Sequence, residues 1–158
     1  MPGRIVSSPW PALLTLLLGA SICPGRPLAS ADGPVALRLE VSADRPRYAI
    51  GEPVRLTLAL TNPGRDAVSL ITPSSQHYEF VVWKVGEEVW RWSADQMFLT
   101  VLSRLTILPG ETRTFTAEWD QRDRAGRPVG PGDYLVVGTL IGGEQVRLTP
   151  RQLRITIR

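Results

Sequence analysis

The side chains that could do chemistry are few. The sequence has a single histidine, His77, which together with Ser93 and Asp95 supplies the residue types of a serine-hydrolase triad. Such a triad needs a nucleophile held at a sharp turn, beside backbone amides that bind the oxyanion. The residues around Ser93 show neither pattern. A lone histidine among strand aromatics is far more often structural or merely exposed than catalytic, and we expect the protein not to be an enzyme.

Metal and nucleotide sites have equally little support. Zinc sites need clustered cysteine and histidine, which the sequence lacks. Asp120, Asp123 and Asp133 offer oxygen ligands of the kind that calcium prefers, but arginines are interleaved with them and the spacing of an EF-hand is absent. We therefore expect a solvated loop with internal ion pairs. No glycine-rich loop opens a helix, and the sequence predicts neither a metal nor a cofactor.

The tryptophans allow two interpretations. Trp90 and Trp92 are two residues apart, so both would face the same side of a strand. A place in the core is favoured, because aromatic residues are strong strand and core formers. The alternative is an exposed aromatic platform for a protein or a sugar. We expect Trp83 to be the most exposed of the group, and Trp119 to anchor the charged loop that follows it.

Residues 1–31 have the pattern of a signal peptide. Arg4 is followed by the apolar run 12–20 and then by the small residues Ala29-Ser30-Ala31. The apolar run is shorter than the roughly 20 residues that cross a bilayer. We expect cleavage before Asp32 and export to the periplasm, cell envelope or medium, with no membrane span. Lipidation of Cys23 is the weaker alternative, because bulky Ile22 precedes it.

The remaining residues, 32–158, are enough for one domain that buries about two-thirds of its unfolded surface. The formal charge of +3 falls further once Arg4 and Arg26 leave with the leader. A nearly balanced charge is no electrostatic footprint for nucleic acid. Without Cys23 the domain has no cysteine, so it can form no disulfide. We expect a monomer stabilised by its core alone.

Short segments alternate apolar and polar residues and are separated by proline and glycine turns. Period-two alternation is typical of half-buried strands. The pattern predicts strands at 35–41, 54–60, 67–72, 105–108, 112–119 and 134–140, a hairpin over 78–92, and a closing pair over 146–149 and 153–157. About eight strands at this spacing indicate an all-β, immunoglobulin-like antiparallel β-sandwich without the intersheet disulfide.

The block from 73 to 98 is more particular than a generic β-sandwich. It contains Ser74, Ser75, Gln76, Tyr78, Phe80, Trp90 and Trp92, and ends in Met97-Phe98. This block resembles the BsuPI-type family of intracellular proteinase inhibitors, and the segments 108–111, 119–120, 126–129 and 131–134 match the family's pattern in order. The resemblance covers most of the domain. It implies an immunoglobulin-like sandwich that inhibits a subtilisin-type serine proteinase.

Two connections, 93–103 and 120–132, are longer than hairpin turns, and loops on a rigid scaffold are where function concentrates. Subtilisin-type clefts favour large apolar side chains, so we expect the proteinase contact at Gln96, Met97, Phe98 and Leu99. The alternative is that Met97 and Phe98 tuck inward to cap the sandwich. The arginine-rich loop 120–132 is a weaker candidate, since it would suit an acidic cleft.

An export signal disagrees with the word intracellular in the family's name. Either the target is an extracytoplasmic proteinase, or this branch keeps the fold for another binding role. One such role is a non-catalytic envelope module for protein–protein interaction or assembly, which would use strand edges or loops. Another is carbohydrate binding, with Trp83 or Trp90 and Trp92 as stacking platforms.

Overall fold

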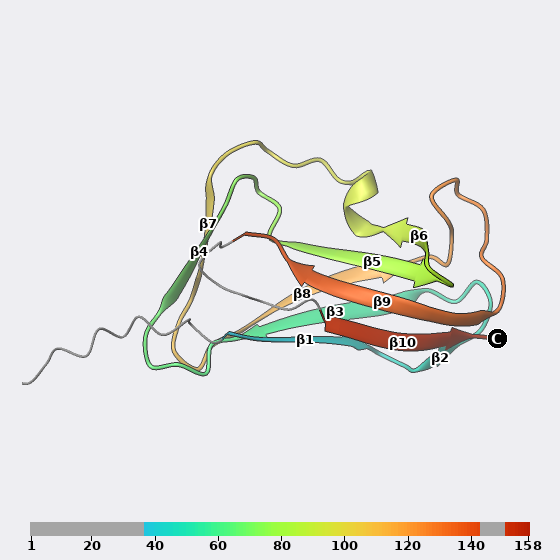
Figure 1. Cartoon of the computed structure of the whole chain (residues 1–158), viewed down its shortest axis with the longest axis horizontal. Coiled ribbons are helices and arrows are strands. Elements are labelled where there is room, and N and C mark those ends of the chain that lie inside the picture. The colour runs from blue at the N-terminus through green and yellow to red at the C-terminus, as the bar shows by residue number, and fades with distance from the viewer. Residues whose placement is uncertain (1–36, 143–150) are drawn as a thin grey trace, which may run out of the picture. The chain divides into compact units, whose positions relative to one another are not determined.

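A computed structural model describes residues 37–142 and 151–158 (Figure 1). The predicted leader, Cys23 and the predicted strand 146–149 lie outside these residues. The described part is all-β apart from one short 3-10 helix, η1, and its elements are β1 (Arg38–Ala43), β2 (Arg47–Tyr48), β3 (Val54–Thr61), β4 (Val68–Thr72), β5 (Tyr78–Lys84), β6 (Glu87–Arg91), η1 (Trp92–Asp95), β7 (Ser103–Ile107), β8 (Thr112–Trp119), β9 (Gly132–Leu140) and β10 (Arg151–Ile157).

The described strands form two main sheets and a separate pair. One sheet has the order β1-β3-β8 and the other the order β2-β10-β9-β5-β6, while β4 pairs only with β7. All pairings are antiparallel except β10 with β2. The run β10-β9-β5-β6 corresponds to strands G, F, C and C′ of an immunoglobulin variable domain. The predicted immunoglobulin-like sandwich is confirmed, and Figure 1 shows the β4–β7 pair set apart at one end of it.

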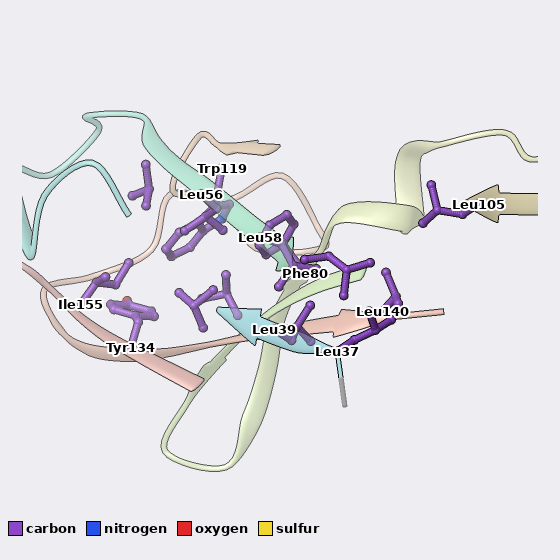
Figure 2. Packing of buried hydrophobic residues seen from close by; sticks show 14 of the residues in the cluster. Leu37, Leu39, Leu56, Leu58, Phe80, Leu105, Trp119, Tyr134, Leu140 and Ile155 are labelled. Atoms are coloured by element: carbon purple, nitrogen blue, oxygen red, sulfur yellow. The ribbon is translucent and has the colours of Figure 1, made fainter. Parts of the chain in front are cut away.

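The core lies between the inner faces of the two main sheets. In β3 every second residue is fully buried, which leaves Arg55, Thr57, Ala59 and Thr61 facing outward. Figure 2 shows Leu56, Leu58 and Trp119 from one sheet meeting Phe80 and Tyr134 from the other. Each such side chain contributes about 1.5–3 kcal/mol when removed from water. The sandwich core is therefore formed by the alternation of apolar and outward-facing residues along the strands, without a disulfide.

A glycine in the middle of β9 sets how closely the sheets approach. A Cβ atom on Gly138 would lie 2.7 Å from Leu58 Cδ1 and 3.2 Å from Val41 Cγ2. A side chain there would force the Leu58 and Val41 side chains to shift. Gly138 thus favours the close packing of the sheets, in the way that strand glycines often mark close approach of another chain segment.

The β5–β6 hairpin turns through two residues in the left-handed region, Val85 with φ 48° and Gly86 with φ 84°. Two positive φ angles define a type I′ turn, which matches the twist of the flanking strands. A β-branched residue is strained in that region. The hairpin therefore tolerates Val85 at a cost in stability.

The predicted strand 88–92 ends one residue early. β6 stops at Arg91, and Trp92 begins the 3-10 helix η1. The expectation that Trp90 and Trp92 belong to one strand is therefore wrong, although both rings pack against the core. The chain turns here because the backbone N–H of Ser93 donates a hydrogen bond to the Glu79 carboxylate on β5 at 3.1 Å, which draws the backbone out of the sheet.

Candidate functional site

Residues 96–102, here called the linking segment, connect η1 to β7 without regular secondary structure. Figure 1 shows this yellow stretch arching away from the main sheets. Its side chains are unusually apolar for an exposed loop: Met97 is 99% exposed, Leu102 81% and Leu99 69%. Apolar side chains held in water along one segment are typical of a surface that binds a partner.

Phe98 is the exception within the linking segment, because it turns inward. Its ring lies 5.7 Å from that of Trp92, which stacks on Tyr78 at 4.1 Å. Tyr78 in turn stacks on Phe115 of β8 at 4.8 Å. The alternative in which both Met97 and Phe98 tuck inward is thus wrong for Met97, while Phe98 is half-buried. The aromatic column fixes the segment to the sandwich on one side.

Ser75 clamps the backbone of the same segment. The N–H of Leu99 donates to Ser75 Oγ, and the N–H of Ser75 donates to the carbonyl oxygen of Leu99, both at 3.0 Å. The turn that holds Ser75 is itself braced, since the Thr72 hydroxyl donates to the Ser74 carbonyl at 2.6 Å and the Gln76 N–H donates to Ser74 Oγ at 3.2 Å. Two segments singled out from the sequence, 74–76 and 96–99, are therefore brought together.

Glu79 supports the site from below, and no sequence pattern singled it out. It is only 6% exposed, and its carboxylate collects donors from Gln76, from its own strand β5, from β6 and from η1. Oε1 accepts the N–H groups of Phe80 and Ser93, each at 3.1 Å, while Oε2 accepts the Ser93 hydroxyl and Gln76 Nε2. Arg91 Nη1 adds an ion pair at 3.4 Å. Because Gln76 ends segment 74–76 and Ser93 lies in η1, which leads into segment 96–102, Glu79 braces the base of both segments.

The charged network continues outward from Arg91. Its Nη2 lies 2.5 Å from Glu88 Oε2, and Arg124 Nη1 lies 3.6 Å from Glu88 Oε1. The hydrogen bond from Arg91 holds the pKa of Glu88 below its ordinary value, and the same contact raises the pKa of Arg91. The network joins the β5–β6 hairpin to the loop 120–132.

The loop 120–132 has the internal ion pairs expected of it. Arg127 pairs with Asp123 at 2.7 Å, and Arg122 with Asp120 at 3.5 Å. The backbone N–H of Arg127 donates to the Asp123 carboxylate and lowers its pKa. Trp119 anchors the loop as expected, because its Nε1 donates to the Arg122 carbonyl at 2.8 Å. Each of the loop's three arginines therefore has an acidic partner, Arg124 pairing with Glu88.

The other candidate chemistry is not brought together. The His77 ring lies 3.3 Å from Ser103 Oγ, whereas the Ser93 hydroxyl donates to Glu79, so no triad forms from His77 and Ser93. Within residues 37–142 and 151–158 no cluster of three or more acidic, histidine or cysteine side chains could hold a metal. In the same residues no helix is long and apolar enough to cross a membrane.

The tryptophans do not form a free platform. Trp90 packs against the core and lies 6.4 Å from Trp119, while Trp92 is covered by Tyr78 and Phe98. Trp83 is half-buried and, unlike Trp90 and Trp92, is not among the residues packed against the core. The packing of Trp90 and Trp92 weakens the carbohydrate-binding interpretation for that pair, because stacking on a sugar needs open ring faces.

Comparison with known proteins gives one strong match and several weak ones. No curated protein matches the chain. Solved structures with similar coordinates include a β-glucosidase of Erythrobacter marinus (15% identity, TM-score 0.47, 78% of this chain and 15% of that one) and the alkylpurine DNA glycosylase AlkC of Pseudomonas fluorescens (14%, 0.46, 77% and 30%). A CARDB domain from Pyrococcus furiosus is 15% identical with a TM-score of 0.45, and the match covers 78% of this chain and 88% of that domain.

The first structures matched are much longer proteins, of which this chain spans less than a third. Similarities this weak transfer no activity to the chain. The family model described as intracellular proteinase inhibitor, BsuPI, matches residues 39–145. That match runs from β1 through β9 and includes segments 74–76 and 96–102. The chain belongs to the BsuPI family of proteinase inhibitors.

Proposed function

We propose that the protein is an exported inhibitor of a subtilisin-type serine proteinase and that the linking segment 96–102 enters the proteinase cleft. The observation that supports this most directly is that the linking segment exposes apolar side chains while its backbone is held in place by the sandwich. Met97 and Leu99 stand in solvent, while Phe98 is packed on Trp92 and the Leu99 backbone is clamped to Ser75. A ligand that is already ordered loses less entropy on binding.

The size of the contact is consistent with the proposal. A proteinase–inhibitor interface buries roughly 1,600 Å² in total. The linking segment supplies a row of apolar side chains, and the turn at 74–76 lies beside it through the Ser75–Leu99 hydrogen bonds. Two adjacent loops thus offer one continuous contact surface to a partner.

The proposed location outside the cytoplasm rests on the N-terminal sequence pattern. Residues 1–31 resemble a cleaved signal peptide, which supports an extracytoplasmic target. Expression of the full chain with analysis of periplasm and medium tests this directly. A product that begins at Asp32 outside the cytoplasm supports export, and a full-length cytoplasmic product contradicts it.

Inhibition is tested with residues 32–158 titrated against a panel of subtilisin-type and trypsin-type proteinases. We expect tight inhibition of at least one subtilisin-type enzyme, and a rise of about 100-fold or more in the inhibition constant for Leu99→Asp. Val85→Asp is the matched control, because Val85 is an exposed apolar residue in the β5–β6 turn. Equal inhibition by both folded variants would remove the linking segment from the contact.

The second candidate is a non-catalytic envelope module for protein–protein interaction or assembly. The same exposed segment would then bind a protein that is not a proteinase. Absence of inhibition across the whole panel at micromolar concentration would favour this function.

A further inference from the structure

We propose that Met97 is the side chain that fills the primary specificity pocket of the target, and that the Met97–Phe98 peptide bond is the one presented to the catalytic serine. This inference rests on the proposed function and makes it more specific. It assigns to one residue the choice of proteinase, and to its neighbours the resistance of the inhibitor to cleavage.

Exposure selects Met97 among the apolar residues of the linking segment. At 99% exposed it has almost no contact with its own fold, so its whole side chain is free to enter a pocket. The residue before it, Gln96, has extended backbone angles, φ −109° and ψ 150°. An extended backbone with an outward apolar side chain is the form in which a proteinase cleft binds its substrate, as an added strand.

The backbone hydrogen bonds exclude Leu99 from that role. A scissile carbonyl must turn into the oxyanion hole of the proteinase, where backbone N–H groups bind it. The Leu99 carbonyl already accepts the N–H of Ser75 at 3.0 Å. Phe98 is excluded by its side chain, which packs on Trp92. Among the described residues no hydrogen bond engages the Met97 carbonyl.

Both sides of the Met97–Phe98 bond are tied to the sandwich. On the amino side, the Gln96 N–H donates to the Ser93 carbonyl at 3.2 Å, within the turn that Glu79 holds. On the carboxyl side, Phe98 lies against Trp92, and Leu99 is clamped by Ser75. If the bond is cut, neither new end is free to leave.

This restraint explains how an exposed peptide could inhibit and not be consumed. The proteinase serine attacks the Met97 carbonyl carbon and gives its proton to the catalytic histidine. When the C–N bond breaks, that proton passes to the Phe98 nitrogen, leaving a Met97 ester and a free Phe98 amine. The amine stays at high effective concentration. It therefore attacks the ester and re-forms the peptide bond faster than water can hydrolyse it.

A gain-of-function exchange tests the assignment. Trypsin-type proteinases have an acidic residue at the base of the primary pocket, so we expect Met97→Lys to improve trypsin inhibition by about 100-fold and to weaken subtilisin inhibition. Leu99→Lys and Leu102→Lys, at exposed positions of the same segment, are matched controls for the gain of trypsin inhibition alone, because the whole segment is proposed to enter the subtilisin cleft. Circular dichroism checks that all three fold.

The outcomes separate the two proposals. If wild type inhibits a subtilisin-type enzyme but trypsin inhibition is gained by Leu102→Lys, or by none of the three, the assignment of Met97 is overturned while the proposed function stands. If wild type inhibits nothing in the panel, both are overturned.

Chemical modification provides a second measurement. Met97 is the only methionine after Met1, so mild peroxide converts one apolar side chain of residues 32–158 into a polar sulfoxide. We expect oxidised wild type to lose at least tenfold in affinity and Met97→Leu to be unaffected. Mass spectrometry after long incubation with catalytic proteinase should find one nick, between Met97 and Phe98. A sole nick elsewhere in 96–102 would overturn the assignment.

Discussion

Replacing Glu79 by glutamine tests whether a buried carboxylate holds the base of the linking segment. The exchange keeps the shape of the side chain but replaces one acceptor oxygen by an NH₂ group. Five donors converge on the two oxygens: the N–H groups of Phe80 and Ser93, the Ser93 hydroxyl, Gln76 Nε2 and Arg91 Nη1. Either orientation of the amide therefore directs its N–H groups against at least two donors.

The size of the effect follows from those lost bonds. A hydrogen bond to a charged group contributes about 1.5–3 kcal/mol, and an unsatisfied buried donor costs a similar amount. Two such losses, reduced by relaxation and by water reaching half-exposed Arg91, lower the free energy of unfolding by about 3 kcal/mol. With a urea slope of about 1.5 kcal/mol per molar, the unfolding midpoint falls by about 2 M.

Urea denaturation of residues 32–158, followed by tryptophan fluorescence, measures this shift. Glu87→Gln is the matched control, because Glu87 is an exposed carboxylate in the same hairpin; we expect its midpoint to stay within about 0.3 M of wild type, as for most surface changes. Hydrogen exchange should also rise at Ser93 and Leu99 in the Glu79 variant. A midpoint shift for Glu79→Gln no larger than that of the control would refute the role given to this carboxylate.

Three further outcomes follow from the fold. Val85→Asn should stabilise the protein by about 1 kcal/mol in thermal melts, because asparagine tolerates the left-handed region that the type I′ turn requires. A lower melting temperature of the variant would contradict the assignment of a left-handed backbone to residue 85. Gly138→Ala should lower the free energy of unfolding by about 1–3 kcal/mol through overpacking. Gly130→Ala is the control, because the nearest atom would be 3.9 Å from the new Cβ, and it should change the stability little. Equal effects of the two variants in thermal melts would argue against the close approach of the sheets at Gly138. Burial and the hydrogen bond to Asp44 raise the pKa of Tyr48 to about 12, so its neutral form stabilises the fold below pH 10 and this contribution is lost as the pH rises towards 12. Tyr48→Phe should lose less stability than wild type over that range in denaturation at each pH, and an identical pH profile would count against this coupling.

The fold class could be predicted because its signal is local. The alternation in β3 places Val54, Leu56, Leu58 and Leu60 on one face, and a period of two needs no knowledge of the rest of the chain. Strand order is different. The parallel pairing of β2 with β10 and the separation of β4–β7 from the main sheets depend on segments far apart in sequence, and residue periodicity carries no information about which strands become neighbours.

The role of Glu79 beneath the linking segment could not be predicted either, because it too depends on contacts between segments far apart in sequence. Alternation along β5 places Glu79 on the face opposite Phe80, where a carboxylate would ordinarily meet water. It is buried because Arg91, Gln76 and the turn at Ser93 close over it. The displacement of Trp92 from β6 is a consequence of the same contact. A tertiary hydrogen bond to one carboxylate thus overrides the strand pattern of several residues.

The residues that hold the linking segment differ from the side chain that we propose selects a target. Ser75 binds the backbone of Leu99, and Trp92, which stacks on Tyr78, packs against Phe98, whereas Met97 has almost no contact with the fold. A change at Met97 therefore alters what the segment presents without altering how it is held. Relatives that keep the three supporting residues but carry another side chain at position 97 should fold alike and inhibit proteinases of different pocket chemistry, as binding specificity is set by the contacts that differ between competing partners.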